Sequence, residues 1–299
     1  MAVRRSDLYL PANNEHMILK APTLGADVIT LDMEDSVPPA EKEVARQMVK
    51  KHIKEMSVTG SEAWVRINAW DTDLTLADLD AVVVDGLDGI TLPKCSGLAD
   101  VRRLDDEITR LEKLRGLPVG KIKIAILIET ALGVLTVDES VGGSSRLVAV
   151  IFGAVDYTRD MRVTRTDKAD EQFYARAKIG VAARAHGLVA EDAPFPNYSD
   201  VEAFEANCRS GAQLGFEGRQ IINPRQIAAA HKVYSPDPAR VEWAKKITKV
   251  FEEEGLAKGS ASVGFEGSMI DIPVYRDGLN ILARQKEIEE KEAARGAKA

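Results

Sequence analysis

Two acidic residues in this sequence follow apolar runs and could hold a metal ion together. Glu129 comes directly after the run 122–128, and Asp156 comes four residues after the run 147–152. Magnesium takes one or two carboxylates from a protein and leaves its other positions to water and substrate. An acid at a strand-to-helix turn can instead accept backbone N–H bonds as a helix cap. The occurrence of both acids after neighbouring predicted strands favours the metal site.

Arg66 is a candidate for binding a negatively charged oxygen. It stands between apolar residues in the segment WVRIN, which predicts a strand. A planar guanidinium can donate two hydrogen bonds to a carboxylate or stabilise an oxyanion. It can also form a structural ion pair with an acid such as Glu34, because buried charges need partners. One guanidinium can do both, so the two interpretations are compatible.

Three acids lie close together after another apolar run. Asp32, Glu34 and Asp35 directly follow the stretch DVITL, which predicts a buried strand. We interpret this cluster as part of the site, either in the reaction or in support of the metal ligands, rather than as surface charge. Lys94 ends the segment LPK and either pairs with these acids or contacts the substrate.

These candidate residues all fall near the ends of predicted strands. Short apolar runs alternate with longer amphipathic segments, which is typical of repeated β/α units and a parallel sheet. Eight such units favour a closed (β/α)8 barrel, the TIM barrel, over an open doubly wound sheet, and barrel enzymes carry their reactive side chains at the carboxyl ends of the strands. The strands are predicted at 7–11, 28–33, 63–68, 89–93, 122–128, 147–152, 188–191 and 219–222. The helices are predicted at 14–21, 39–56, 73–83, 98–114, 131–138, 171–186, 199–214 and 224–233.

The pattern changes after residue 234. The segment SPDP interrupts the chain, and a helix is predicted to about 254, followed by a glycine- and serine-rich stretch at 255–267 and a final helix with a charged tail. We therefore predict a barrel over 1–234 and a C-terminal helical extension over 235–299. The glycine-rich stretch is either part of this helical extension or a mobile lid over the barrel.

The composition excludes several classes of function. The 299 residues include 40 basic and 47 acidic side chains, giving a formal net charge of −7, so neither nucleic acid nor an anionic membrane is an expected partner. No segment approaches the ~20 apolar residues of a membrane span, and the first ten residues lack the apolar region of a secretory signal. The two cysteines, Cys95 and Cys208, have no paired spacing. We expect a cytoplasmic protein, with Cys95 a buried thiol rather than a nucleophile.

Nine short segments, taken in their order and spacing, resemble the HpcH/HpaI aldolase and citrate lyase superfamily, and within it the branch of proteins similar to the citrate lyase β-subunit. The resemblance covers nearly the whole chain. The segments are LPAN at 10–13, LDMEDSV at 31–37, VRIN at 65–68, LPK at 92–94, IET at 128–130, GAVD at 153–156, GFEGR at 215–219, NPRQ at 223–226 and GSMID at 267–271.

The resemblance implies a (β/α)8 barrel that binds Mg²⁺ and cleaves or forms a carbon–carbon bond in a 3-hydroxyacyl thioester, usually of coenzyme A. Glu129 and Asp156 match the metal ligands, and Arg66 matches the arginine that touches the reacting oxygen. Asp271 matches an aspartate that reaches the active site of a neighbouring subunit, which implies a homo-oligomer, often a trimer. The related pyruvate aldolases carry a histidine after the second strand, and no histidine lies near Asp32.

The leading hypothesis is an Mg²⁺-dependent lyase that converts malyl-CoA or citramalyl-CoA into acetyl-CoA and a 2-oxo acid. Arg66, Asp271 and Glu34 are its candidate catalytic residues, while Arg66, Asp32 and Lys94 are its candidate substrate-binding residues. The alternatives are a malate-synthase-like condensation followed by thioester hydrolysis, a citryl-thioester lyase subunit of a larger complex, and a non-catalytic barrel that binds acyl-CoA. The C-terminal extension argues against the citryl-thioester alternative. Candidates for the phosphates of coenzyme A are Arg4, Arg5, Lys20 and Arg225.

Overall fold

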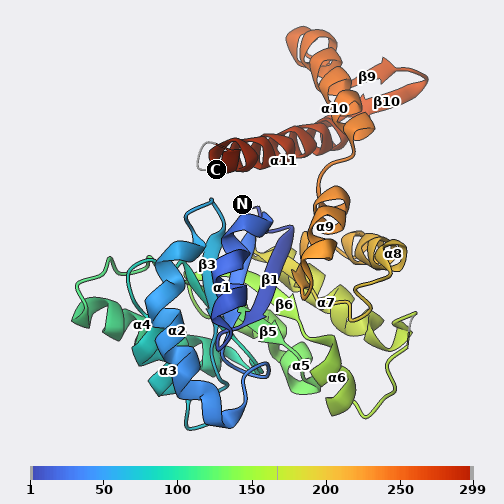
Figure 1. Ribbon diagram of the computed structural model, residues 1–299. Coiled ribbons are helices and arrows are strands. Elements are labelled where there is room, and N and C mark those ends of the chain that lie inside the picture. Colours follow the sequence, from blue (N-terminus) through green and yellow to red (C-terminus); the bar gives the residue numbers. More distant parts are fainter. Residues whose placement is uncertain (1–2, 167, 297–299) are drawn as a thin grey trace. The chain divides into compact units, whose positions relative to one another are not determined.

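The chain is seen in a computed structural model that describes residues 3–166 and 168–296 (Figure 1). These residues form two compact units, one ending at Tyr234 and one beginning at Ser235. None of the helices in the described residues is both long and apolar enough to cross a lipid bilayer.

The first unit is built on a closed barrel of parallel strands. Each strand pairs with its neighbours in chain order, and the last strand pairs back with the first. The predicted TIM barrel is therefore confirmed, and each predicted strand lies within two residues of an observed one. The strands are β1 (Ser6–Pro11), β2 (Val28–Asp32), β3 (Glu62–Arg66), β4 (Gly89–Leu92), β5 (Lys123–Ile128), β6 (Leu147–Phe152), β7 (Val189–Asp192) and β8 (Gly218–Ile221).

Helices connect the strands and cover the outside of the barrel (Figure 1). In the helix 98–114, for example, Val101, Leu104, Ile108 and Leu111 recur on one face and are buried. The helices are α1 (Glu15–Lys20), α2 (Lys42–Met56), α3 (Thr75–Val82), α4 (Leu98–Leu114), α5 (Ala131–Ser140), α6 (Ala154–Asp160), α7 (Phe173–Ala185), α8 (Val201–Gln213) and α9 (Ile227–Tyr234). Short 3₁₀ turns lie at Ala21–Leu24, Pro39–Glu41, Asp170–Gln172 and Pro224–Gln226.

One helix of the barrel unit was not predicted. The seven residues of α6 follow β6 directly, and they hold too few turns to produce an amphipathic repeat. Asp156 lies in the first turn of this helix. The sequence predicted that Asp156 follows the sixth strand, but it did not predict the helix.

The second unit contains α10 (Pro238–Val250), a hairpin of β9 (Ser262–Phe265) and β10 (Ser268–Asp271), and α11 (Ile272–Gly296), with short helical turns at Phe251–Gly255 and Leu256–Lys258. This hairpin was not predicted from the sequence, and the mobile lid stays a prediction. Glu266 and Gly267 join its strands with φ of 47° and 79°, the left-handed pair that tight hairpins require. Ile247, Phe251 and Ile270 form the core of this unit.

Candidate functional site

The site residues are the last members of rows of side chains that point into the barrel. Along a strand every second side chain lies on the same face. Val28 and Trp64 lie in the apolar cluster inside the barrel, as does Leu127. Further along the same faces, at or one residue past the carboxyl ends of the strands, stand Asp32, four residues after Val28, and Arg66 and Glu129, two residues after Trp64 and Leu127. Their convergence at the barrel mouth follows from strand register alone.

Main-chain hydrogen bonds continue past the ends of the strands and fix this mouth. The amide of Met33 donates to the carbonyl of Arg66 at 3.0 Å, and the amide of Gly153 donates to the carbonyl of Ile128 at 3.0 Å. Catalytic side chains held on such rigid elements keep their mutual positions.

Arg66 is held by two acids of the cluster after β2. Its Nε and Nη2 donate to the two carboxylate oxygens of Asp32 at 2.7 and 2.6 Å, and its Nη1 lies 3.1 Å from Glu34. Burial disfavours the charged form of Asp32, but the guanidinium outweighs it and keeps the pKa of this acid below its ordinary value. Asp32 also accepts hydrogen bonds from the amides of Glu34 and Ser36. The ion pair expected for Arg66 is present, with Asp32 as the main partner.

Lys94 connects two acids of the mouth. Its Nζ donates to Glu34 at 2.8 Å, while its backbone N–H donates to Glu129 at 2.8 Å. The residue has a φ of 51°, in the left-handed region that non-glycine residues seldom adopt. Burial raises the pKa of Glu34 above its ordinary value, although Arg66 and Lys94 oppose that effect. Of the two roles considered for Lys94, the ion pair with the acidic cluster is present.

Glu129 and Asp156 do not cap the helices that follow them. The cap of α5 is the Thr130 side chain, which accepts from the amide of Gly133, and α6 has no side-chain cap at its first residue. Burial, together with the charges of Glu34 and Asp156, raises the pKa of Glu129 from 4.5 to about 8. The helix-cap alternative is thus absent, and the two carboxylates concentrate negative charge.

This pair suits a divalent cation. Its oxygens are the ligand type that Mg²⁺ takes, and a bound cation would remove the repulsion that raises the pKa of Glu129. No group of three metal-binding Asp, Glu, His or Cys side chains occurs within 3–166 and 168–296, so the chain would supply these two carboxylates. Asp156 is paired with the exposed Arg159, which would have to release it.

Gly153, three residues before Asp156, leaves space for the side chain of Glu129. A Cβ at position 153 would lie 2.5 Å from the Cβ of Glu129 and 2.6 Å from its Oε2, closer than atoms can approach. Any side chain at this position would displace the carboxylate. Glycine is therefore required at position 153 because it packs against Glu129, and not because of a turn.

Two pockets open at the barrel mouth. The first, the acidic pocket, has a volume of about 290 Å³, and the second, the Arg66 pocket, about 410 Å³. The acidic pocket is lined by Lys94, Glu129, Thr130, Asp156, Arg159, Asp160 and Arg162. The Arg66 pocket is lined by Tyr9, Leu10, Pro11, Met17, Asp32, Asp35, Ser36, Arg66, Pro194, Gln220 and Ile222. Glu34 bonds to a lysine of one pocket and pairs with the arginine of the other.

Sequence reasoning missed Lys42, one of the residues that support the acidic cluster. Lys42 donates to the carbonyls of Met33 and Glu34 and to the side chain of Asn68. Asn68 in turn donates to Asp78 at 2.6 Å. Asn68 stands in the WVRIN segment, at the predicted carboxyl end of the third strand, whereas Lys42 resembles any solvated lysine at a helix start.

Two candidates for coenzyme A phosphates are wrong. Arg4 is buried and pairs with Glu62 at 2.6 Å, and Arg5 is buried and pairs with Asp27 at 2.9 Å. Both precede β1, at the barrel end opposite the site, where their charges need buried partners. Lys20 and Arg225 are exposed.

The thiol of Cys95 is unsuited to nucleophilic attack. The residue is buried and free of any disulfide, and burial raises its pKa to about 12. Because the thiolate is the reactive form, this thiol stays inert at neutral pH.

Asp271 lies in the second unit, at the end of β10 and directly before α11. Its Oδ1 accepts a hydrogen bond from the amide of Val274 at 3.1 Å, the position of a helix cap. Its role at an active site stays a prediction.

The chain matches known proteins over most of its length. The family model described as HpcH/HpaI aldolase/citrate lyase matches residues 5–224. The citrate lyase subunit beta of Leuconostoc mesenteroides subsp. cremoris is 39% identical over 272 residues, covering 91% of this chain and 90% of that protein. The mitochondrial citramalyl-CoA lyase of Mus musculus is 32% identical, covering 96% and 88%.

A solved structure has a fold similar to that of this chain. The protein CitE from Mycobacterium tuberculosis, in complex with magnesium, acetoacetate and coenzyme A, has a TM-score of 0.76 and 29% identity, covering 94% of this chain and 97% of that one. The barrel and its matches over most of both chains identify this protein as a member of the HpcH/HpaI aldolase/citrate lyase family.

Proposed function

We propose that this protein is an Mg²⁺-dependent lyase that cleaves a carbon–carbon bond in the coenzyme A thioester of a 3-hydroxy acid, malyl-CoA or citramalyl-CoA, to give acetyl-CoA and a 2-oxo acid. The observation that carries the proposal is the arrangement of Glu129 and Asp156 beside the Arg66–Glu34–Lys94 network at one barrel mouth. The citramalyl-CoA lyase relative, and the CitE complex with magnesium and coenzyme A, support it.

Glu129 and Asp156 are proposed to hold the metal ion. Bound Mg²⁺ would polarise the oxygens of the substrate and offset charge that builds up on them. Gly153 and the amide of Lys94 hold the Glu129 carboxylate in place. Arg159 forms an ion pair with Asp156 in the metal-free protein. Breaking this exposed ion pair costs little free energy.

Arg66 is proposed to stabilise the substrate oxygen. Asp32 occupies two of its N–H groups and fixes the plane of the guanidinium, which leaves further N–H groups for a developing oxyanion. We assign Lys94 and Asp32 to substrate binding. Glu34 lies between the two cations, and we assign it a catalytic role that depends on holding both of them.

Asp271 of a neighbouring subunit is proposed as the general base. It would accept the proton of the substrate hydroxyl while the carbon–carbon bond breaks, and the electron pair of that bond would leave as the enolate of acetyl-CoA. Apolar side chains exposed on α5 and α7 support a homo-oligomer, with Leu135, Phe173 and Val181 each at least 60% exposed.

Changing Asp271 to asparagine should lower turnover at least about 100-fold and leave Mg²⁺ affinity unchanged, because general-base catalysis contributes about 10² to 10⁴ in rate. Asparagine can still accept the hydrogen bond from Val274, so α11 should persist. Steady-state kinetics and Mg²⁺ titration calorimetry would measure the two effects. A fully active variant would exclude Asp271 as the base.

Mg²⁺ affinity should rise with pH. Since the pKa of Glu129 is about 8 without metal, this acid is mostly protonated at neutral pH, and the ion must displace its proton. The affinity for Mg²⁺ should increase up to about tenfold per pH unit between about pH 6 and pH 8, and it should become constant above that range. Calorimetry in two buffers of different ionisation enthalpy should detect proton release near pH 6. Binding without proton release at that pH would contradict this assignment.

A citryl-thioester lyase is the second candidate function. The alignment with the Leuconostoc citrate lyase subunit spans 272 residues, more than the 234 of the barrel unit, so it extends into the second unit. The C-terminal extension therefore does not argue against this candidate, contrary to the expectation from sequence. The 39% identity favours it.

A product assay tests the candidates together. The purified protein would be incubated with Mg²⁺ and malyl-CoA, both stereoisomers of citramalyl-CoA, or citryl-CoA, and the products identified by mass spectrometry with EDTA controls. We expect acetyl-CoA with glyoxylate or pyruvate, lost with EDTA. Oxaloacetate from citryl-CoA would favour the second candidate. Free malate or citramalate with free coenzyme A would indicate thioester hydrolysis, and no product would reject the coenzyme A lyase and favour a carrier-bound substrate or a non-catalytic barrel.

A further inference from the structure

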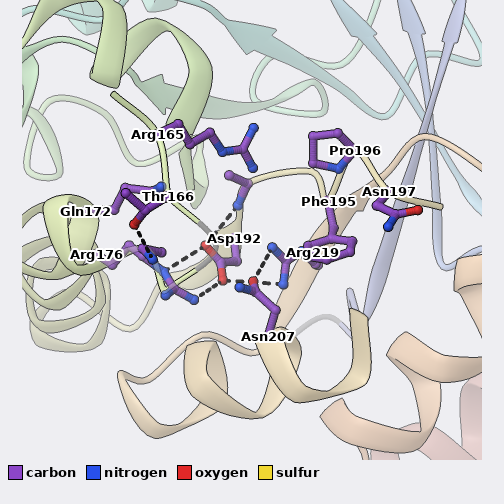
Figure 2. A pocket seen from close by; sticks show the side chains of 12 residues that line it. Arg165, Thr166, Gln172, Arg176, Asp192, Phe195, Pro196, Asn197, Asn207 and Arg219 are labelled. Atoms are coloured by element: carbon purple, nitrogen blue, oxygen red, sulfur yellow. Dashed lines mark hydrogen bonds and ion pairs between the residues drawn. The ribbon is translucent and has the colours of Figure 1, made fainter. Parts of the chain in front are cut away.

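A third pocket lies on the outer side of the barrel, and the proposed reaction does not use it. It opens beside the carboxyl end of β7, between α7 and α8, and has a volume of about 270 Å³. Figure 2 shows its side chains, which come from β7, α7, α8, β8 and the segments after α6 and β7. We call it the Arg219 pocket.

One buried acid in this pocket faces two arginines. Asp192 accepts a hydrogen bond from Arg176 Nε at 3.2 Å and is also bonded to Arg176 Nη2. Arg219 Nη1 lies 3.7 Å from the same carboxylate, at ion-pair distance (Figure 2). A single negative charge thus has to serve two guanidinium groups.

Arg219 keeps an unsatisfied donor inside the protein. The residue is 2% exposed, its Nη2 donates to Asn207 at 2.7 Å, and its Nε has no hydrogen-bond partner. The rings of Phe195 and Phe204 lie 6.0 and 5.5 Å from its guanidinium carbon and compensate only part of the lost hydration. A buried N–H without a partner is costly, and it calls for an acceptor.

Arg165 adds a third positive charge. It reaches the pocket from the segment after β6, and its only hydrogen bond in the described part of the chain is a long one, 3.4 Å from Nη2 to the carbonyl of Pro194. Burial, and after it the charge of Arg219, lower the pKa of Arg165. The described lining residues hold three arginines and one acid.

We propose that the Arg219 pocket binds a phosphate group. A phosphate near neutral pH carries close to two negative charges, which balances three guanidiniums and one carboxylate, and its oxygens can accept from several arginine forks at once. The volume of the pocket exceeds that of several water molecules, so it admits the group and part of what is attached to it.

The phosphate has two chemical sources, free inorganic phosphate or a phosphate of a larger ester such as coenzyme A. The segment after β7 lies between the pockets, because Ala193 and Phe195 line the Arg219 pocket while Pro194 lines the Arg66 pocket. Titration of inorganic phosphate with and without saturating coenzyme A distinguishes the sources. Competition assigns the site to a phosphate of coenzyme A, and independent binding assigns it to free phosphate; both outcomes support the proposal.

Calorimetric titration of inorganic phosphate tests the site without requiring lyase activity. Wild-type protein should bind phosphate at constant ionic strength, and Arg165→Gln should weaken binding about tenfold or more, since a hydrogen bond to a charged group is lost. This half-exposed residue has a single weak contact, so the variant should fold. Arg184→Gln removes the same charge from the exposed side of α7 and should bind as wild type.

Three results would overturn the proposal. The first is wild-type protein that binds phosphate no better than chloride. The second is Arg165→Gln and Arg219→Met variants, both folded by circular dichroism, that bind phosphate with wild-type affinity. Equal weakening by Arg184→Gln would also overturn it, because binding would then depend on overall charge rather than on this pocket.

Discussion

Replacing Glu129 with glutamine should abolish Mg²⁺ binding and catalysis and, at the same time, stabilise the metal-free protein at alkaline pH. Burial and neighbouring acids raise the pKa of Glu129 from 4.5 to about 8. A folded-state pKa above the unfolded value means that protonation favours the fold, fully below about pH 4.5, and that this contribution is lost as the pH rises to about 8. Above that pH the buried charge costs a few kcal/mol, since each unit of pKa shift corresponds to about 1.4 kcal/mol.

Glutamine keeps the shape of the side chain and can still accept from the amide of Lys94. Urea unfolding in EDTA should therefore show wild type and variant converging near pH 5 and the variant gaining stability up to about pH 8 to 9. Glu139→Gln on the exposed side of α5 is the control and should change neither stability nor Mg²⁺ binding. A variant less stable than wild type at about pH 9 would contradict the charge repulsion inferred at this site.

Replacing Arg66 with glutamine should lower kcat about 10² to 10³-fold, the usual effect of removing a donor to an oxyanion. It should also destabilise the protein by about 3 to 5 kcal/mol, because Asp32 is left buried without its partner. Steady-state kinetics and urea unfolding measure the two losses. Arg66→Lys should keep the charge but not the paired hydrogen bonds to Asp32, so it should recover activity only in part.

A double variant separates the two roles of Arg66. Combining Arg66→Gln with Asp32→Asn removes the stranded charge, so stability should recover while activity stays low. Recovery of both would mean that Arg66 acts only through the fold. Arg110→Gln, which breaks an exposed pair with Glu107, should cost less than about 1 kcal/mol and leave kcat unchanged.

The barrel and its mouth were predictable because both depend on local pattern. Continuous apolar runs mark strands covered on both sides, and the polar residue at the end of each run then has one place to go. Asp32 and Glu129 directly follow such runs, and Arg66 stands inside one. Contacts between distant segments leave no such pattern, and Lys42, a lysine at a helix start, could not be linked to Asn68 from sequence.

The burial of charged side chains and the hairpin of the second unit could not be predicted from the sequence. Arg4 and Arg5 carry charges that predict exposure, yet Glu62 and Asp27 make their burial possible at the lower end of the barrel. The strands of the hairpin in the second unit have only four residues each, too few to show a clear alternation of apolar and polar side chains. Such pairings become visible only when the partners are placed in space.

Lys94 contacts Glu129 through its main chain and Glu34 through its side chain. A substitution at position 94 can therefore change the contact with Glu34 and keep the contact with Glu129. Its N–H serves Glu129 whatever side chain the position carries, provided that the left-handed backbone is kept, whereas its ammonium group serves Glu34. Glycine adopts this backbone readily and would keep the first contact while removing the second. Descendants of this chain could therefore change the polarity beside Arg66, and with it the choice of substrate, without disturbing the carboxylate next to Asp156.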